Sequence, residues 1–208
     1  MIRRLIICTL LMLSLTNLLS QGFQGGIVAG LNASRIDGDG HELYGKLGLN
    51  AGAFVSRAII PDVLFWQMEV KYTSRGKYNL ERDIQGTIVG LELIDLRYAE
   101  LPLSVHYFFT GKVQFEVGLA PDLLLMQRYE DENGETPVPL YDQGTFRRAG
   151  ITAFAGANYF ILEPLALGIR FNYSAFPFYK FDAYAVRYRD SGWFHDVLSV
   201  NARYYFLR

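Results

Sequence analysis

The chain has 208 residues, of which 50% are hydrophobic, 15% aromatic and 20% charged, with 20 glycines and one cysteine. It has too little charge and too many aromatic residues for a disordered chain, and its length suits one or two domains. A net charge of −1 argues against nucleic-acid binding, because it provides no global basic field. One cysteine excludes a disulfide framework and a cysteine-built zinc or iron–sulfur site. Soluble domains normally carry more charge, which raises the question of the solvent around this protein.

Residues 1–20 have the order of a secretory signal peptide. Arg3 and Arg4 precede an apolar run at 5–15, and polar residues follow. The run is shorter than the about 20 residues of a membrane-spanning helix. We therefore predict cleavage near residue 20 and a mature domain at 21–208, with an uncleaved anchor as the alternative.

The rest of the chain repeats with a period of two. Trp66, Met68 and Val70, for example, alternate with polar residues, a pattern that predicts a strand with one apolar and one polar face. The same alternation predicts eight strands, at residues 24–36, 44–56, 64–77, 94–108, 113–128, 147–160, 165–176 and 198–206.

The strand at 94–108 requires a special interpretation. Its apolar face begins with Ile94, Leu96 and Tyr98 and then shifts to odd positions from Leu101. A shift of parity next to Pro102 predicts a β-bulge there.

The connections between the predicted strands are of two kinds. Those at 57–63, 109–112 and 161–164 are short, those at 76–91, 130–146 and 177–195 are long, and the first, at 37–43, is intermediate. With antiparallel neighbours all short turns fall at one end, which is typical of outer-membrane barrels. We expect an all-β fold, an eight-stranded antiparallel up-and-down transmembrane β-barrel.

The two faces of the strands decide between a membrane barrel and a soluble lipocalin-like carrier, in which the apolar face would surround a ligand. The polar face holds mainly small residues and isolated charges, which suits a narrow lumen. We therefore assign the apolar face to lipid and expect two aromatic girdles at the membrane interfaces. The girdle residues are Tyr72, Tyr98, Tyr129 and Tyr173 at the loop end, and Tyr107, Phe115, Tyr159, Tyr204 and Phe206 at the turn end.

Three segments carry a resemblance to a known family. The stretch Tyr98-Ala-Glu-Leu-Pro-Leu-Ser-Val-His-Tyr-Phe108, the glycine-rich segment at 26–32 and the aromatic end at 202–208 resemble the PorT-like outer-membrane β-barrel proteins of Bacteroidetes. The resemblance implies an eight-stranded barrel of the OmpX/OmpA-like kind. One member of that family is associated with protein secretion, a role that no residue here supports.

Charged residues on the predicted inner face form a candidate polar network. Both signs occur on several strands, so cross-strand ion pairs can neutralise the interior. A plug that holds the barrel in register is the main interpretation, and a path for a small ion or solute is the alternative. The network comprises Lys46, Glu69, Lys71, Arg75, Asp95, Arg97, Glu116, Asp122, Arg128, Arg148, Arg170 and Arg203.

The three histidines permit an enzymatic alternative, a lipid-modifying barrel, which needs a nucleophile or base near the outer rim. Ser104 and His106 share an inward face near the turn end, and His41 and His195 are expected in outer loops. No convincing triad results, so we expect no catalytic, metal-binding or cofactor-binding residues.

The tyrosine-rich loop at 178–193 is the best candidate for recognition of a partner, because Tyr and Arg are enriched at binding hot spots. Its candidate residues are Tyr179, Tyr184, Arg187, Tyr188, Arg189 and Trp193. We expect a structural or interaction protein in the outer membrane of a Gram-negative bacterium. Its expected partners are lipid and lipopolysaccharide, the barrel-assembly machinery during insertion and other envelope proteins, but not nucleic acid.

Overall fold

The computed structural model describes residues 22–38, 43–82, 88–131, 134–135, 145–180 and 192–206. The predicted signal peptide lies outside these ranges. The strands are β1 (Phe23–Asp37), β2 (Lys46–Ile60), β3 (Leu64–Arg82), β4 (Ile88–Glu100), β5 (Leu103–Phe108), β6 (Val113–Asp131), β7 (Gly134–Glu135), β8 (Thr145–Phe146), β9 (Ala149–Leu162), β10 (Leu165–Ser174), β11 (Tyr179–Lys180) and β12 (Phe194–Tyr205).

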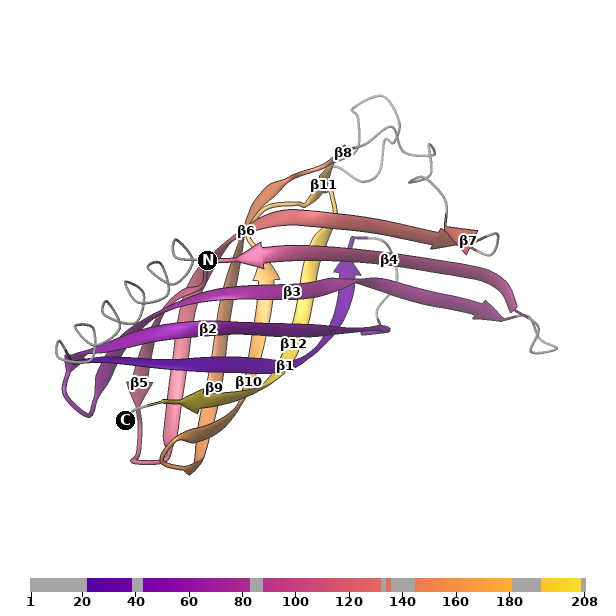
Figure 1. The fold of residues 1–208 in the computed structure, drawn as a ribbon. Coiled ribbons are helices and arrows are strands. Elements are labelled where there is room, and N and C mark those ends of the chain that lie inside the picture. The colour runs from indigo at the N-terminus through magenta and orange to yellow at the C-terminus, as the bar shows by residue number, and fades with distance from the viewer. Residues whose placement is uncertain are drawn as a thin grey trace, which may run out of the picture.

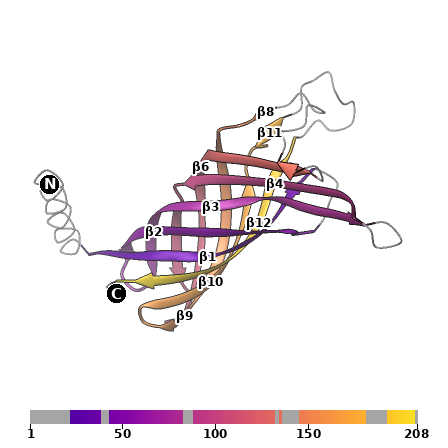
Figure 2. The ribbon, with the colours of Figure 1, turned by 45° about the vertical axis from the view of Figure 1, so that its right-hand side comes forward.

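The strands form a closed antiparallel ring (Figures 1 and 2). Around it β1 pairs with β2, β2 with β3, β3 with β4 and β5, these two with β6, and then β9, β10 and β12 lead back to β1. Closure pairs the strand edges, as the hydrocarbon layer of a membrane demands. The small strands β7, β8 and β11 lie outside the ring and were not predicted.

Strands β4 and β5 together occupy one position in the ring, which therefore has eight strand positions within the described chain. Opposite β3, the register pairs Lys71 with Glu100 and Leu64 with Tyr107, without a shift. Opposite β6 it is equally continuous. The interruption falls at Pro102, which has no N–H to donate to a ladder.

This continuity shows that the predicted parity shift next to Pro102 is wrong. Even-numbered residues from Ile94 to His106 are all buried, including Tyr98 and Glu100. Ile94, Leu96 and Tyr98 therefore face the interior and not lipid. The sequence pattern assigned these residues to lipid because they are apolar. The loop end of the interior is apolar as well, so apolar character does not distinguish the two faces there.

A bulge does occur, but on β6. Between β4 and β6, Arg97 is opposite Met126 while Tyr98 is opposite Leu124, so Leu125 is an extra residue. An extra residue reverses the facing of everything beyond it. Arg128 is therefore exposed, and Tyr129 packs against the interior cluster.

The ring has short turns at one end, as predicted, and the remaining connections at the other. The predicted long loop at 76–91 is wrong, because most of it is strand. β3 runs to Arg82, β4 starts at Ile88, and the two stay paired throughout. Figure 1 shows β3, β4 and β6 continuing well past the other strands.

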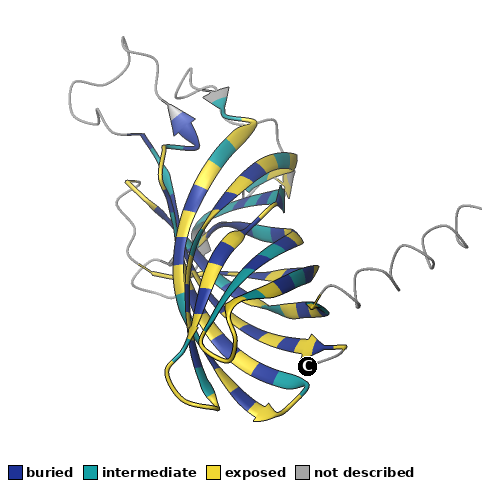
Figure 3. Cartoon of the chain, turned by 90° about the vertical axis from the view of Figure 1, so that its left-hand side faces the viewer, coloured by how far each residue is buried: buried dark blue, intermediate teal, exposed yellow. Residues whose placement is uncertain are grey.

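The strands expose alternate residues, as the banding in Figure 3 shows. The exposed face carries large apolar side chains at every strand position of the ring, such as Leu31, Leu49, Val117 and Ile169. Most of the buried face is polar or charged. Within the described ranges, no helix has the length and apolarity needed to cross a membrane.

Gly76 provides a test of the β3–β4 pairing. Its φ is 151°, and a Cβ there would lie 2.0 Å from the carbonyl oxygen of Ile94. We expect Gly76→Ala to lower the free energy of unfolding by about 1–3 kcal/mol, the cost of a strained backbone position, as measured by urea unfolding in lipid vesicles. Gly111→Ala is the control, since a Cβ at Gly111 meets nothing within 4 Å. Equal urea midpoints for the two variants would contradict the assigned geometry.

Candidate functional site

The interior of the barrel has three layers. At the turn end, Val28, Phe54, Phe160, Ala166 and Tyr205 form an apolar cluster. At the loop end a second apolar cluster contains Ile36, Ile94, Leu96, Tyr98, Phe178 and Tyr179. Between them lie ionised and polar side chains. Apolar layers at both ends place these charges in a low-dielectric environment, where unpaired groups are costly.

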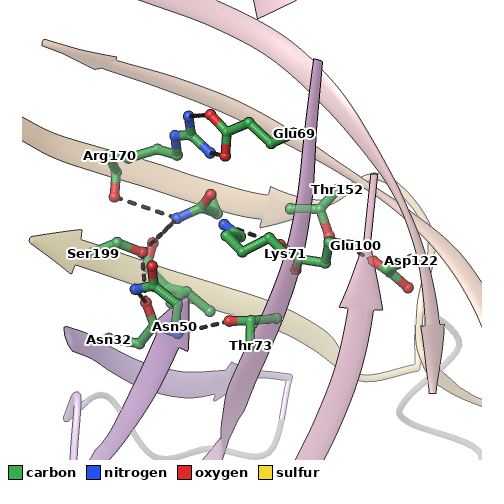
Figure 4. A network of polar contacts seen from close by, with 12 residues as sticks. Asn32, Asn50, Glu69, Lys71, Thr73, Glu100, Asp122, Thr152, Arg170 and Ser199 are labelled. Atoms are coloured by element: carbon green, nitrogen blue, oxygen red, sulfur yellow. Dashed lines mark hydrogen bonds and ion pairs between the residues drawn. The ribbon is translucent and has the colours of Figure 1, made fainter. Parts of the chain in front are cut away.

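Two carboxylates and two guanidinium groups form the central cluster, which we call the four-charge cluster: Glu69, Glu116, Arg170 and Arg203. Arg170 bonds to Glu69 in a bidentate manner at 2.7 and 3.2 Å and to Glu116 through Nε at 2.8 Å. Figure 4 shows the Arg170 and Glu69 side chains facing each other from β10 and β3. Arg203 Nη1 lies 2.9 Å from Glu116 Oε2. The cluster is neutral and joins strands β3, β6, β10 and β12.

A second neutral group lies nearer the loop end. Lys71 Nζ is 3.1 Å from Glu100 Oε2, and Arg75 is 3.1 Å from Glu100 and 2.8 Å from Asp122. Thr152 accepts a hydrogen bond from Arg75 and donates one to Asp122. The Arg75 guanidinium also lies over the Tyr98 ring, 4.0 Å from its centroid. Again two cations face two carboxylates, so the layer carries no net charge.

Uncharged side chains link the strands on the other side of the lumen. Asn32 donates to Thr73 at 2.8 Å and accepts from Asn50 at 2.7 Å and Ser199 at 2.8 Å (Figure 4). Asn172 also donates to Ser199. Such links satisfy polar groups that would otherwise be buried without partners.

Inward-facing glycines provide the room for these large side chains. A Cβ at Gly156 would lie 2.8 Å from Glu116 Oε1, and one at Gly168 would lie 2.0 Å from Asn158 Oδ1. The glycine content of the sequence therefore has a packing role here.

The structure buries eight of the twelve predicted network residues inside the barrel and leaves four elsewhere. The buried ones are Lys46, Glu69, Lys71, Arg75, Glu116, Asp122, Arg170 and Arg203. Asp95 lies on the other side of β4 from Tyr98 and pairs with Lys46 at 2.6 Å.

The prediction is wrong for Arg97, Arg128 and Arg148. Leu96 and Tyr98 are buried on the inner face of β4, so Arg97, which lies between them, is on the outer face. It pairs with Asp95. The β6 bulge turns Arg128 outward, where its side chain is 43% exposed and pairs with Glu130. Arg148 precedes β9 and is exposed. Arg128 and Arg148 lie at the loop ends of β6 and β9, whereas Arg97 lies in the second half of β4, opposite Met126 of β6.

Two interior residues were missed or misplaced. Glu100 was not included, although it pairs with Lys71 and Arg75; an uninterrupted even-numbered pattern across Pro102 would have revealed it. His195 is not in an outer loop but in β12, 1% exposed. Its Nε2 lies 3.0 Å from the Tyr98 hydroxyl, and its ring stacks on Phe178 at 3.8 Å.

The predicted girdle is only partly on the outer face. Tyr72, Phe115, Tyr107, Tyr159, Tyr204 and Phe206 are exposed there, and Tyr173 is partly exposed and donates to Asp37. The prediction is wrong for Tyr98 and Tyr129. The unbroken alternation of β4 turns Tyr98 toward the interior, and the β6 bulge does the same for Tyr129. A role of the exposed set at a membrane interface stays a prediction.

The proposed partner loop is also partly corrected. Tyr179 is buried and stacks on the partly buried Trp193, with ring centroids 4.8 Å apart. Tyr179 therefore supports the loop-end cluster and is not free to contact a partner. Tyr184, Arg187, Tyr188 and Arg189 lie outside the described residues.

Ser104 and His106 form the arrangement nearest to a catalytic pair. Ser104 Oγ lies 2.8 Å from His106 Nε2, but His106 Nδ1 lies 3.0 Å from the neutral amide oxygen of Gln114. Both are buried near the turn end. His41 lies outside the described residues, and the part of the chain that the structure describes contains no group of His, Cys, Asp and Glu suited to a metal ion.

The closed ring, the apolar outer face and the polar interior define a small transmembrane-type β-barrel with eight strand positions in the described chain. Among solved structures, the chain is similar to Ail, the attachment invasion locus protein of Yersinia pestis, with 15% identity over 88% of this chain and 98% of that one and a TM-score of 0.51. A second Ail structure, in complex with the heparin analogue sucrose octasulfate, gives 14% identity, 88% and 99% coverage and a TM-score of 0.50. No protein-family model and no curated protein matches this chain. The PorT-like resemblance therefore stays a prediction.

The four-charge cluster predicts a large effect of removing one charge. Glu69→Gln leaves Arg170 and Arg203 facing Glu116 alone. We expect the free energy of unfolding to fall by about 3–5 kcal/mol, as for other broken buried ion pairs, measured by urea unfolding in lipid vesicles.

The matched control is Asp62→Asn in an exposed turn, where φ is 62°. Asn tolerates this conformation, so its effect should stay within about 0.5 kcal/mol. If both variants unfold at the same urea concentration, the cluster does not hold the barrel together.

Proposed function

We propose that this chain is a non-enzymatic β-barrel protein of the outer membrane of a Gram-negative bacterium, exported by residues 1–20. It acts in the cell envelope through its loop end. The observation that carries this proposal is the neutral, interlocked interior, in which Glu69, Glu116, Arg170 and Arg203 are buried and engaged with one another. Charged groups that are paired with one another across the strands are poorly suited to conduct ions or to react.

The outer face supports a position in a membrane. Large apolar side chains are exposed around the ring, far more than a soluble domain normally leaves in water. Assembly machinery for insertion and other envelope proteins at the loop end are the partners that such a protein would require.

The filled interior predicts a barrel with little conductance. We expect the full chain, reconstituted in planar lipid bilayers, to give no steady current above that of protein-free membranes, because an eight-stranded barrel with a packed interior leaves little bore. Folding is checked by heat-modifiable migration in gels. Regular single-channel steps from the folded protein would contradict the proposal, as would a changed set of lipid A acyl chains in cells that produce it.

Three arginines on the outer face, of which Arg97 is partly exposed and the other two are exposed, support contact with lipopolysaccharide. Arg97, Arg128 and Arg148 lie on the neighbouring strands β4 and β6 and just before β9, close to exposed Leu125 and Met126. Strands are about 4.8 Å apart and rise about 3.3 Å per residue. Arg148, Arg97 and Arg128 lie at the levels of residues 124, 126 and 128 of β6, so they span about 13 Å along the outer face. Arg is suited to phosphate because its guanidinium can donate two parallel hydrogen bonds.

We expect lipopolysaccharide in phosphatidylcholine vesicles to raise the stability of the wild type more than that of a variant with Arg97→Gln, Arg128→Gln and Arg148→Gln. Exposed ion pairs contribute about 0.2–1 kcal/mol each, so the loss should be roughly 1–3 kcal/mol, measured by urea unfolding with and without lipopolysaccharide. The control combines Arg57→Gln and Lys112→Gln at the turn end and should respond like the wild type. An equal response of both variants would remove lipopolysaccharide as the partner of the arginines.

A further inference from the structure

A cavity of about 280 Å³ lies in the barrel wall at the loop end of β6, β9 and β10. The β6–β9 ladder ends at Leu123 and Ala149, and the β9–β10 ladder ends at Thr152 and Ser174. Beyond these pairs only single backbone bonds follow, from Leu124 N to Arg148 O, from Ala175 N to Ile151 O and from Arg147 N to Phe178 O. The cavity lies where the regular pairing is interrupted. Its size is close to the lower end of known ligand pockets, about 300–1,000 Å³.

The lining of the cavity has two different sides. Ile151 and Phe176 belong to it and are exposed on the outer face, whereas Arg75, Tyr98 and His195 belong to it and are buried in the interior. The cavity therefore connects the apolar outer surface with the polar interior. Gly150 also lines it, and a side chain there would collide with Asp122, since its Cβ would lie 2.7 Å from Oδ1.

Two of the buried lining residues keep a nitrogen without a hydrogen-bond partner among the described residues. Arg75 is fixed through its two terminal nitrogens by Glu100, Thr152 and Asp122, which leaves Nε. His195 is fixed through Nε2 by Tyr98, which leaves Nδ1. A buried polar group without a partner is unfavourable. A small movement that brings a ligand oxygen to them would recover that cost.

The charges around the cavity favour a neutral ligand. Arg75 and Arg147 line it together with Asp122, and Glu100 also pairs with Arg75. Arg75 and Lys71 are neutralised together by Glu100 and Asp122, so Arg75 offers no uncompensated charge, and an anionic head would lie close to Asp122. A hydroxyl or carbonyl oxygen can accept from Arg75 Nε, and from His195 Nδ1 when Tyr98 donates to Nε2, without adding charge.

We propose that this cavity binds a small neutral amphiphile, with its apolar chain against Ile151 and Phe176 and its hydroxyl or carbonyl oxygen toward Arg75 and His195. The site goes beyond the proposed function and uses neither the exposed arginines nor the four-charge cluster. Its access from the apolar outer face means that the ligand arrives from the lipid phase.

The test uses the full barrel in phosphatidylcholine nanodiscs with ¹⁵N-labelled histidine. 1-Octanol should shift the His195 Nδ1 resonance in a saturable manner and leave His106, which lies at the other end of the interior, unchanged. Octane, which lacks the oxygen, should not shift it, and octanoate should bind at least tenfold more weakly than 1-octanol. A similar shift with octane or tighter binding of octanoate would overturn the proposal.

Ala149→Trp fills the rim of the cavity and should abolish the saturable shift. The matched control is Ala153→Trp, the second next outward-facing position on β9, which is not part of the lining. It should keep the shift. If Ala149→Trp keeps it as well, the cavity is not the binding site. If Ala149→Trp does not fold, Ile151→Trp serves as the second blocking variant and is judged by the same result.

Discussion

The pairing of Glu69 and Glu116 with Arg170 and Arg203 is the interaction on which the rest of the structure depends. The residues come from four strands that are far apart in sequence, and each guanidinium contacts both carboxylates. Burying these charges is costly, and removal of one partner costs more than the pair contributes. The cluster therefore acts less as a source of net stability than as a requirement that four strands meet in one register.

That requirement is strong because of the surroundings. A slip of one residue in any of these strands would turn its charge toward the apolar outer face, where Arg is costly in the middle of a membrane. Apolar layers at both ends, such as Phe54 with Tyr205 and Ile94 with Leu96, limit the access of water to the cluster. Inward glycines such as Gly156 leave space for the carboxylates. Small residues, charges and apolar ends thus specify the same arrangement.

The alternation in the sequence predicted the strands and most of the inward charges. In a barrel between lipid and a polar lumen, apolar and polar side chains must alternate along each strand. It failed where hydrophobicity no longer distinguishes the faces. Ile94, Leu96 and Tyr98 are apolar and yet face inward, since they belong to the loop-end cluster. It failed again at Arg128, because the extra residue at Leu125 leaves no mark in the pattern. The ion pairs themselves could not be predicted, since strand alternation gives a facing but no relative height between strands.

Buried polar atoms without a partner among the described residues occur at both ends of the interior, such as Ser56 Oγ near the turn end, but two of them line the cavity at the loop end. Near the turn end, His106 bonds to Ser104 through Nε2 and to Gln114 through Nδ1, and the rings of Phe108 and Phe160 stack on each other. At the loop end the regular pairing of β9 is interrupted, a cavity opens in the wall, and Arg75 and His195 keep nitrogens without a partner among the described residues. A buried group without a partner lowers stability, and such costs are typical of functional regions and not of purely structural ones. Arg75 and His195 belong to β3 and β12, the strands that also carry Glu69 and Arg203, so the cluster that fixes the register of these two strands also sets where the two nitrogens lie at the cavity.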